Sequence, residues 1–409
     1  MNTKKRNRKI RMAIPACLLA IIFAVAATAC GNQAPNAPDA PEPLAVKKEA
    51  VPPRDTSSDR IGNQQDWEAI YETVLNNEPF SNIRDFFGGS EKYGYEWNYG
   101  YYDIDDNGVP ELLIALNTLE STLDFGGYGV YVKQIWTAVN GAGVLLIEDF
   151  GEGDSEGVYL CNDDIIGTQQ FSPAPDYNYY RIIKGEYIEV VASLSCYLSG
   201  EDVQYHFSEG QDAFINYDSN TTITEDEFNK IEKQYGSDPD ARNLTEWFPI
   251  PPMQNVVKAP KFSRIVASSE KASMGSVSYR ADHVQDNDFQ TAWCEGVSGP
   301  GLGEWIEFKA DSNQTVNGFA IVNGYCKYGN AGDFYYLNNA VKKITIIADG
   351  FTQSYYLGWE SYKYHKIFFE KPIQTETIRF QIDEVYYGSS SGLPDADDED
   401  TLISELHFY

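Results

Sequence analysis

Alternating apolar and polar residues in the second half of the chain constrain the fold most strongly. Such runs occupy residues 303–310, 316–325, 341–349, 362–370 and 376–387. A period of two is typical of strands that bury one face, and polar turns separate the runs. Because almost no helical periodicity interrupts them, these repeated strands predict a β-sandwich.

The first half predicts a mixture of strands and helices. Strand-like runs at 96–102, 128–139, 143–150 and 187–198 are separated by Gly, Asn and Asp clusters. A stripe of large apolar side chains at helical spacing predicts an amphipathic helix, formed by Trp67, Ile70, Tyr71 and Val74. A second helix is predicted from Thr224, which would cap it together with Glu227. The region therefore reads as a β-rich α+β domain.

The chain after the first 64 residues is too long for one ordinary core, since domains usually divide beyond roughly 250–300 residues. The closely spaced prolines of the segment EWFPIPP can continue neither a helix nor a central strand, so we place a boundary near residues 250 to 262. Two domains are predicted, at 65–255 and 262–409.

The first 29 residues resemble a bacterial lipoprotein signal. Basic residues precede the apolar run AIPACLLAIIFAVAATA, which ends directly before Cys30. The resemblance implies cleavage before Cys30, lipidation of that cysteine, and anchoring on the extracytoplasmic face of a bacterial cell membrane. The alternative is a single membrane-spanning anchor. Residues 30–64 are rich in Pro and Ala and predict a disordered tether.

The mature chain is strongly acidic. Removing the six basic residues of the signal from 31 leaves 25 Lys and Arg against 61 Asp and Glu, a net charge of −36. Such a surface repels phosphate backbones, which argues against a nucleic-acid partner, and it favours cations. The remaining thiols allow two alternatives, either disulfides joining Cys161 to Cys196 and Cys294 to Cys326, or four free cysteines.

An acidic loop at residues 103–111 is a candidate calcium site. Oxygen-bearing side chains stand at alternate positions around Gly108, and these are Asp103, Asp105, Asn107 and Glu111. Converging oxygens are what Ca²⁺ requires. Position 12 of an EF-hand would be Ile114, so the spacing instead resembles the strand-loop-strand calcium loops of FG-GAP repeats. A solvated hairpin turn is the alternative, because Asn-Gly is itself a turn signal.

Four motifs are spread across the second half, namely DNDFQTAW at 286–293, GLGEWI at 301–306, NGYCK at 323–327 and DTLISE at 400–405. Together they resemble a discoidin-type, galactose-binding-like module, in particular the glycan-binding kind that accompanies NAD-glycohydrolase. The resemblance implies a discoidin-like β-sandwich, or jelly roll. It also implies a structural Ca²⁺ held by Asp286, the carbonyl of Asp288, Thr291 and Glu405. Asn287 replaces the usual glycine, and Asn tolerates a left-handed conformation.

Carbohydrate recognition by such a module would use loops at one end of the sandwich, where aromatic rings and polar groups meet sugar faces and hydroxyls. The candidates for glycan binding are Tyr325, Lys327, Tyr328, Tyr335, Tyr336, Asn338 and Trp359. Ala340 stands where the family tends to have arginine. Trp293 and Trp305 are instead predicted to lie in the core.

No sequence motif indicates an enzyme: the four histidines form no HExxH pair, and no GxSxG elbow occurs. The leading hypothesis is a lipid-anchored, calcium-stabilised surface protein that binds a glycan or cell-wall polysaccharide. A surface hydrolase, with the first domain acting on a polymer that the module recognises, is one alternative. A protein-interaction or wall-sensing protein is another.

Overall fold

The computed structural model describes thirteen stretches of the chain. They are residues 67–77, 95–118, 130–148, 157–161, 165–171, 175–199, 202–210, 221–235, 247–250, 259–329, 332–359, 362–389 and 400–409. The chain separates into two compact units, 1–56 and 57–409, and every described residue belongs to the second. The predicted signal at 1–29, the tether at 30–64 and Cys30 lie outside the described residues, as does most of the predicted domain boundary. None of the described helices is long and apolar enough to cross a membrane.

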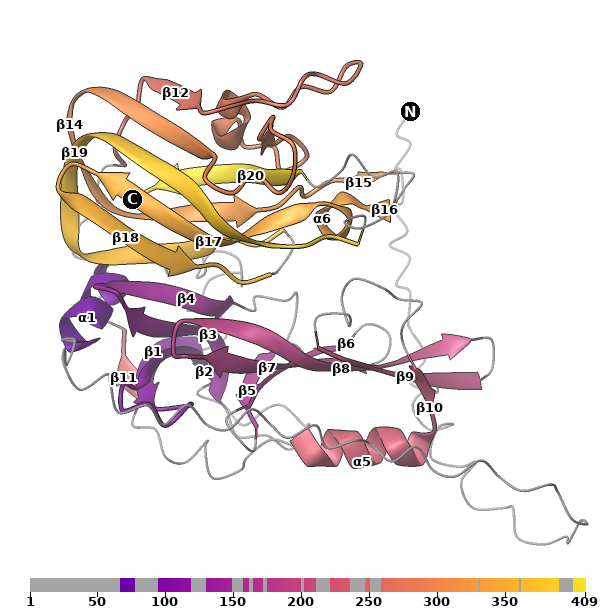
Figure 1. Cartoon of the computed structure of the whole chain (residues 1–409). Coiled ribbons are helices and arrows are strands. Elements are labelled where there is room, and N and C mark those ends of the chain that lie inside the picture. The colour runs from indigo at the N-terminus through magenta and orange to yellow at the C-terminus, as the bar shows by residue number, and fades with distance from the viewer. Residues whose placement is uncertain are drawn as a thin grey trace, which may run out of the picture. The chain divides into compact units, whose positions relative to one another are not determined.

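Antiparallel strands dominate the described residues up to 250 (Figure 1). In chain order they are β1 (Tyr95–Tyr102), β2 (Glu111–Thr118), β3 (Val130–Val139), β4 (Ala142–Glu148), β5 (Gly157–Leu160), β6 (Ile165–Phe171), β7 (Pro175–Ile183), β8 (Tyr187–Ser199), β9 (Asp202–Glu209), β10 (Thr221–Ile223) and β11 (Phe248–Pro249). Each of β1 to β3 pairs with the next strand, and so does each of β5 to β9; β5 also pairs with β3, and β11 with β1. This meander confirms the predicted β-rich region.

Two helices pack on these strands, and the sequence predicts both of them. Helix α1 (Trp67–Asn77) buries Ile70, Tyr71 and Val74. Helix α5 (Glu225–Tyr235) begins with the predicted capping box: the Glu227 amide donates to Thr224 Oγ1, while the Thr224 amide donates to Glu227 Oε2. Its one fully buried side chain, Phe228, packs on Tyr177 and Tyr205.

The second half forms the predicted β-sandwich (Figure 1, salmon to yellow). Its elements are β12 (Arg264–Ala267), η3 (Ala281–Gln285), β13 (Trp293–Cys294), β14 (Trp305–Asn323), β15 (Tyr328–Gly329), β16 (Gly332–Asp333), α6 (Phe334–Leu337), β17 (Asn339–Ala348), β18 (Phe351–Tyr356), β19 (His365–Tyr386) and β20 (Thr401–Phe408). Strand β14 pairs with β12, β19 and β20, while β17 pairs with β18 and β19.

Two of the polar turns expected between strands are absent from this part of the structure. Most residues of the runs at 303–310 and 316–325 belong to one long strand, β14, and most of those at 362–370 and 376–387 to another, β19. The intervening polar residues stay extended because they pair with each other, as Gln314 with Thr375 and Thr315 with Gln374, across a register shift. The polar residues between the runs therefore indicate a mostly exposed stretch within each strand, and they do not form a turn.

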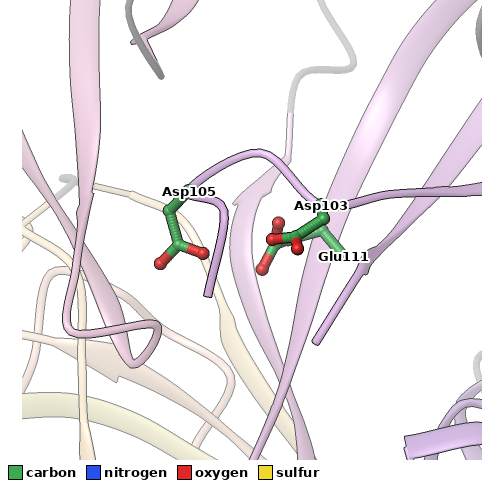
Figure 2. A group of neighbouring side chains, drawn as sticks. All are labelled: Asp103, Asp105 and Glu111. Carbon is green, nitrogen blue, oxygen red and sulfur yellow. The ribbon is translucent and has the colours of Figure 1, made fainter. Parts of the chain in front are cut away.

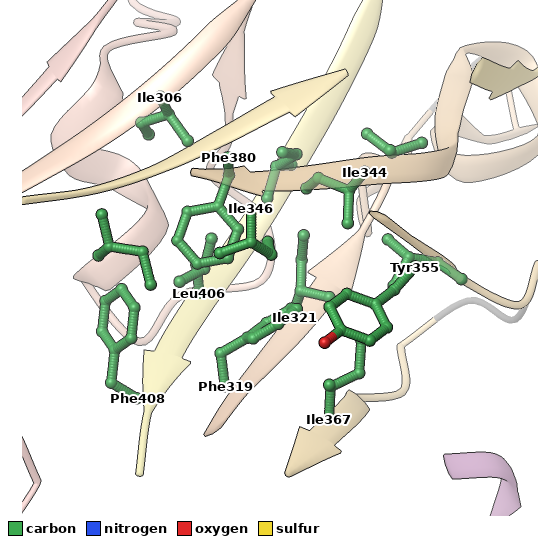
Figure 3. Close-up of a cluster of buried hydrophobic side chains, with 14 of the residues drawn as sticks. Ile306, Phe319, Ile321, Ile344, Ile346, Tyr355, Ile367, Phe380, Leu406 and Phe408 are labelled. Atoms are coloured by element: carbon green, nitrogen blue, oxygen red, sulfur yellow. The ribbon is translucent and has the colours of Figure 1, made fainter. Parts of the chain in front are cut away.

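The sandwich closes over a large apolar core (Figure 3). Most of its members are fully buried, and those labelled in the figure are Ile306, Phe319, Ile321, Ile344, Ile346, Tyr355, Ile367, Phe380, Leu406 and Phe408. Each such side chain contributes roughly 1.5–3 kcal/mol through burial. Trp293 is also in this core, as predicted, whereas Trp305 is half-buried beneath the guanidinium of Arg379.

The four cysteines predicted to be either paired or free form no disulfide with one another, and they are Cys161, Cys196, Cys294 and Cys326. Cys161, Cys294 and Cys326 are buried. Burial raises the pKa of the Cys161 and Cys326 thiols to about 12, which makes both poor nucleophiles.

Candidate functional site

Exposed tyrosines gather on the loops at one end of the sandwich. Figure 1 shows β15, β16 and α6 together at this end. Tyr328 in β15 is 74% exposed, Tyr387 after β19 is 54% exposed, and Tyr362 before β19 is 42% exposed. Large aromatic side chains usually bury most of their surface, so three exposed rings on neighbouring loops indicate a recognition surface. We call these three residues the tyrosine cluster.

Hydrogen bonds hold the three loops of the tyrosine cluster together. The amide of Tyr362 donates to Cys326 Sγ at 3.2 Å, beside the start of β15. The amide of Ser389, two residues after Tyr387, donates to the carbonyl of Tyr336 at 2.8 Å. Within the first loop, Tyr328 pairs with Asp333, whose side chain caps α6. The described residues of these three loops are therefore tied to one another by hydrogen bonds.

Tyr362 has an unusual backbone conformation, with φ at +59°. Bulky residues rarely adopt the left-handed region, and such strain is found most often at functional sites. Burial, followed by the nearby Asp333 carboxylate, raises the pKa of the Tyr362 hydroxyl. The hydroxyl therefore stays neutral and can both donate and accept a hydrogen bond.

Three of the seven residues predicted for glycan binding are buried instead. Tyr325, Tyr335 and Trp359 are only 4%, 0% and 7% exposed, so their rings belong to small cores under the loops, contrary to the prediction. Tyr335 packs against Gly324, where even a Cβ would come within 2.6 Å of its ring. A sugar cannot reach these faces.

The other four predicted residues lie at the same end as the tyrosine cluster. Tyr328 is exposed, and Lys327, Tyr336 and Asn338 are half-buried. Sequence reasoning missed Tyr362 and Tyr387. The exposure of Tyr387 could have been predicted from strand alternation. It follows Tyr386, which is buried at the end of a strand, so the side chain of Tyr387 points to the opposite face.

The turn at residues 286–291 is ordered by its own polar groups. Asn287 adopts φ +61°, the left-handed conformation expected of it. Asp286 Oδ1 accepts the amide of Asp288 at 2.9 Å, and Asp286 Oδ2 accepts the hydroxyl of Thr291 at 2.7 Å. The carbonyl of Asp288 accepts the same hydroxyl. Burial raises the pKa of Asp286, but the hydrogen bonds from His283, Thr291 and Asp288 outweigh it, and the net pKa is lowered.

Glu405 lies in β20, and this strand contacts the turn. The Gln285 amide group donates to the carbonyl of Leu406, and the Ser404 hydroxyl donates to the carbonyl of Phe289. Glu405 is fully buried, and neither of its carboxylate oxygens has a hydrogen-bond partner. His407 Nε2 lies 3.1 Å from Glu405 Oε2 and could balance the charge only when protonated. A buried carboxylate without donors fits a bound cation.

Glu295, to which the sequence assigned no role, joins two distant segments. Its side chain is buried and accepts the amides of Val297 at 2.9 Å and Thr401 at 3.3 Å. Nearby, Lys271 forms an ion pair with Asp400. These contacts tie the loop after β13 to the start of β20, so Glu295 has a structural role.

In the first half, the loop at 103–111 brings three predicted ligands together. Carboxylate oxygens of Asp103, Asp105 and Glu111 lie within 4.8 Å of one another, the only such acidic group among the described residues. The fourth predicted ligand, Asn107, is exposed at the tip of the loop. Asp286, Asp288 and Glu405 form no comparable group of three carboxylates.

Comparison with known proteins identifies the second half. Residues 258–409 match the model of the family described as "NAD glycohydrolase translocation F5/8 type C domain". The chain therefore carries a discoidin-like module at its C-terminus, with a β-sandwich fold. No curated protein matches the chain.

Several solved carbohydrate-binding modules are similar to the same part of the chain. One is CBM32 of AlyQ in complex with 4,5-unsaturated mannuronic acid, which is 14% identical, covers 37% of this chain and 98% of that chain, and has a TM-score of 0.25. Another is the family 32 CBM from C. perfringens NanJ in complex with galactose, with 18% identity, 36% and 91% coverage and a TM-score of 0.24. The CBM32-1 and CBM32-2 domains from Clostridium perfringens ZmpB, in complex with GalNAc, are 12% identical, with 36% and 33% coverage and a TM-score of 0.26. These scores are too low to indicate a function.

Proposed function

We propose that the C-terminal module binds carbohydrate through the tyrosine cluster, and that the protein presents this module on the outer face of a bacterial cell membrane. The observation that carries the proposal is the group of exposed rings at one end of the sandwich: Tyr328, Tyr362 and Tyr387. Flat aromatic faces match the C–H faces of a sugar ring, while neighbouring Lys327 and Asp333 supply groups for hydroxyls.

Removal of single rings from the tyrosine cluster is expected to weaken glycan binding about tenfold each, or about 1.4 kcal/mol. The variants are Tyr328→Ala, Tyr387→Ala and Tyr362→Asn; Asn is chosen at 362 because it tolerates the positive φ. The purified full-length chain would be screened on a glycan array. Calorimetry with galactose, N-acetylgalactosamine and an unsaturated mannuronic acid would then give the dissociation constants.

Leu302→Ala is the matched control, since Leu302 is 55% exposed on the same module but outside the tyrosine cluster. Its affinity should equal that of the wild type. If the wild-type chain binds no glycan on the array, carbohydrate binding is excluded. If Leu302→Ala weakens binding as much as the tyrosine variants do, the site lies elsewhere on the module.

We further propose that Ca²⁺ stabilises this module at the turn formed by Asp286, Asp288 and Thr291, with Glu405 as a ligand from β20. The carboxylate of Glu405 is buried and accepts no hydrogen bond, although the His407 ring lies 3.1 Å away, and this supports the assignment. A cation there would neutralise a charge that β20 otherwise buries, and it would join the turn to the C-terminal strand.

Anchoring would depend on Cys30, so Cys30→Ser is expected to abolish lipid labelling. Cells expressing the full-length chain would be fed radioactive palmitate, and the membrane fraction would be separated from the soluble fraction. The wild type should be labelled and sediment with membranes, because diacyl anchoring is stable whereas one chain alone is not. Cys17→Ser is the control and should keep the label, since Cys17 lies within the apolar run. An unlabelled wild type would refute the anchor.

A further inference from the structure

A buried glutamate closes the loop between β1 and β2. Glu111 is the first residue of β2, pairs with Tyr102 at the end of β1, and is 0% exposed. Its Oε2 accepts the amide of Ile104 at 2.8 Å. Its Oε1 is buried and has no hydrogen-bond partner. An ionised carboxylate can accept about four hydrogen bonds, so this side chain is far from satisfied by protein groups.

Two further carboxylates lie close to the Glu111 side chain. Figure 2 shows Asp103 beside Glu111, with the carboxylate of Asp105 turned toward them from across the loop. The three groups place oxygens within 4.8 Å of one another. Three ionised carboxylates at this separation repel one another unless a positive charge lies among them.

Hydrogen bonds from backbone amides to side chains fold the loop into a tight bend. Asp103 accepts the amide of Asn107 through Oδ1 and that of Gly108 through Oδ2, and Asn107 Oδ1 accepts the amide of Val109. Asp106 and Gly108 have φ of +52° and +86°, which produces the sharp bend. A solvated hairpin turn would need these features, but it would not need a fully buried glutamate directed at two aspartates.

We propose that Asp103, Asp105, Asn107 and Glu111 bind a Ca²⁺ ion. All the donors are oxygen atoms, as hard cations prefer, and they come from one short, irregular loop. Calcium accepts such irregular geometry with six to eight oxygens, whereas Mg²⁺ demands a near-ideal octahedron and keeps several waters. The ion would supply the positive charge that the Glu111 side chain lacks. This site lies outside residues 258–409, which match the family model.

The loop is also connected to helix α1, which gives the ion a structural consequence. The hydroxyl of Tyr71 donates to the carbonyl of Pro110 at 2.7 Å, next to Glu111. The rings of Tyr71 and Trp67 lie 5.9 Å and 5.0 Å from that of Tyr101, which is two residues before Asp103. Ion binding should therefore tighten the docking of α1. These rings are also placed to transfer excitation energy to a bound lanthanide.

Terbium luminescence tests the site directly. The full-length chain carrying Glu405→Gln, which removes the proposed ligand in β20, would be titrated with Tb³⁺ under excitation of Tyr and Trp, and Ca²⁺ or Mg²⁺ would then compete. Luminescence should rise and be displaced by Ca²⁺. Adding Glu111→Gln or Asp103→Asn should weaken Ca²⁺ binding about tenfold or more, because affinity follows ligand charge.

Asp106→Asn is the matched control. It removes one charge from the exposed part of the same loop, and Asn tolerates the left-handed φ of this position. It should leave Ca²⁺ affinity within about twofold, since a screened surface charge contributes little. Equal losses from Asp106→Asn and Glu111→Gln would show only diffuse attraction to acidic residues and overturn the site. No displacement by Ca²⁺ would also overturn it, and stronger displacement by Mg²⁺ would overturn the choice of metal.

Discussion

Trp293→Ala is expected to reduce the free energy of unfolding by about 3 to 5 kcal/mol, a large part of the roughly 5 to 15 kcal/mol available to a domain. Trp293 is 0% exposed, and its backbone pairs with that of Ile403 in β20. Alanine would leave a cavity the size of the indole ring. It would also leave the carbonyl of Ser269 without the hydrogen bond that it accepts from the indole N–H at 3.0 Å. Urea unfolding of the full-length chain would measure the loss as a lower midpoint.

Trp305→Ala is the matched control for this substitution. Trp305 is half-buried and packs one face against the guanidinium of Arg379, whose central carbon lies 3.9 Å from the ring centre. Its loss should cost about 1 to 2 kcal/mol, because partly exposed cation–π contacts contribute that much. Equal costs at the two positions would contradict the assignment of Trp293 to the core.

Local patterns in the sequence predicted local structure well. The acidic loop was expected to join two strands, and these are present as β1 and β2. The capping box at Thr224 and Glu227 involves only neighbouring residues and was also correct. Asn287 adopts the conformation that its position in the motif requires. In each case the interactions that decide the structure lie within a few residues of one another.

Exposure of aromatic residues could not be predicted in the same way. Tyr325, Tyr335 and Trp359 were expected to face a ligand, but partners from distant strands bury them. Trp359 stacks on Tyr386, with 5.2 Å between ring centres and 2° between planes, across a large separation in sequence. Tyrosine suits both half-buried strands and binding loops, so residue type alone cannot separate the two.

The position of Tyr362 illustrates what tertiary structure adds. The sequence assigned it to the start of a strand, because alternating residues follow it up to Phe369. In the structure it precedes β19 in a turn, where its amide donates to Cys326 Sγ. That contact spans 36 residues, and no periodicity within a short window reports it. The same limitation hid the burial of Glu405, which pairs with Val322 of β14, 83 positions earlier in the chain.

Glu405→Gln is expected to abolish the stabilisation of the C-terminal module by calcium. At calcium concentrations a hundredfold above the dissociation constant, an ion that binds only the folded state contributes about 2.7 kcal/mol. For a domain of this size that raises the melting temperature by roughly 5 to 11 °C. Melting of the full-length chain would be followed in calcium and in chelator. Both proteins would carry Glu111→Gln, so that the loop at 103–111 does not contribute.

The order of stabilities should reverse between the two conditions, and this reversal separates a metal ligand from an ordinary buried residue. In calcium, the chain that retains Glu405 should melt higher, because the ion balances its charge. In chelator, Glu405→Gln should melt at the same temperature or higher, since it removes a buried charge that has no hydrogen-bond donors. His407→Gln should keep the response to calcium. If it destabilises the protein equally in both conditions and calcium has no effect, protonated His407 balances Glu405 and the metal site does not exist.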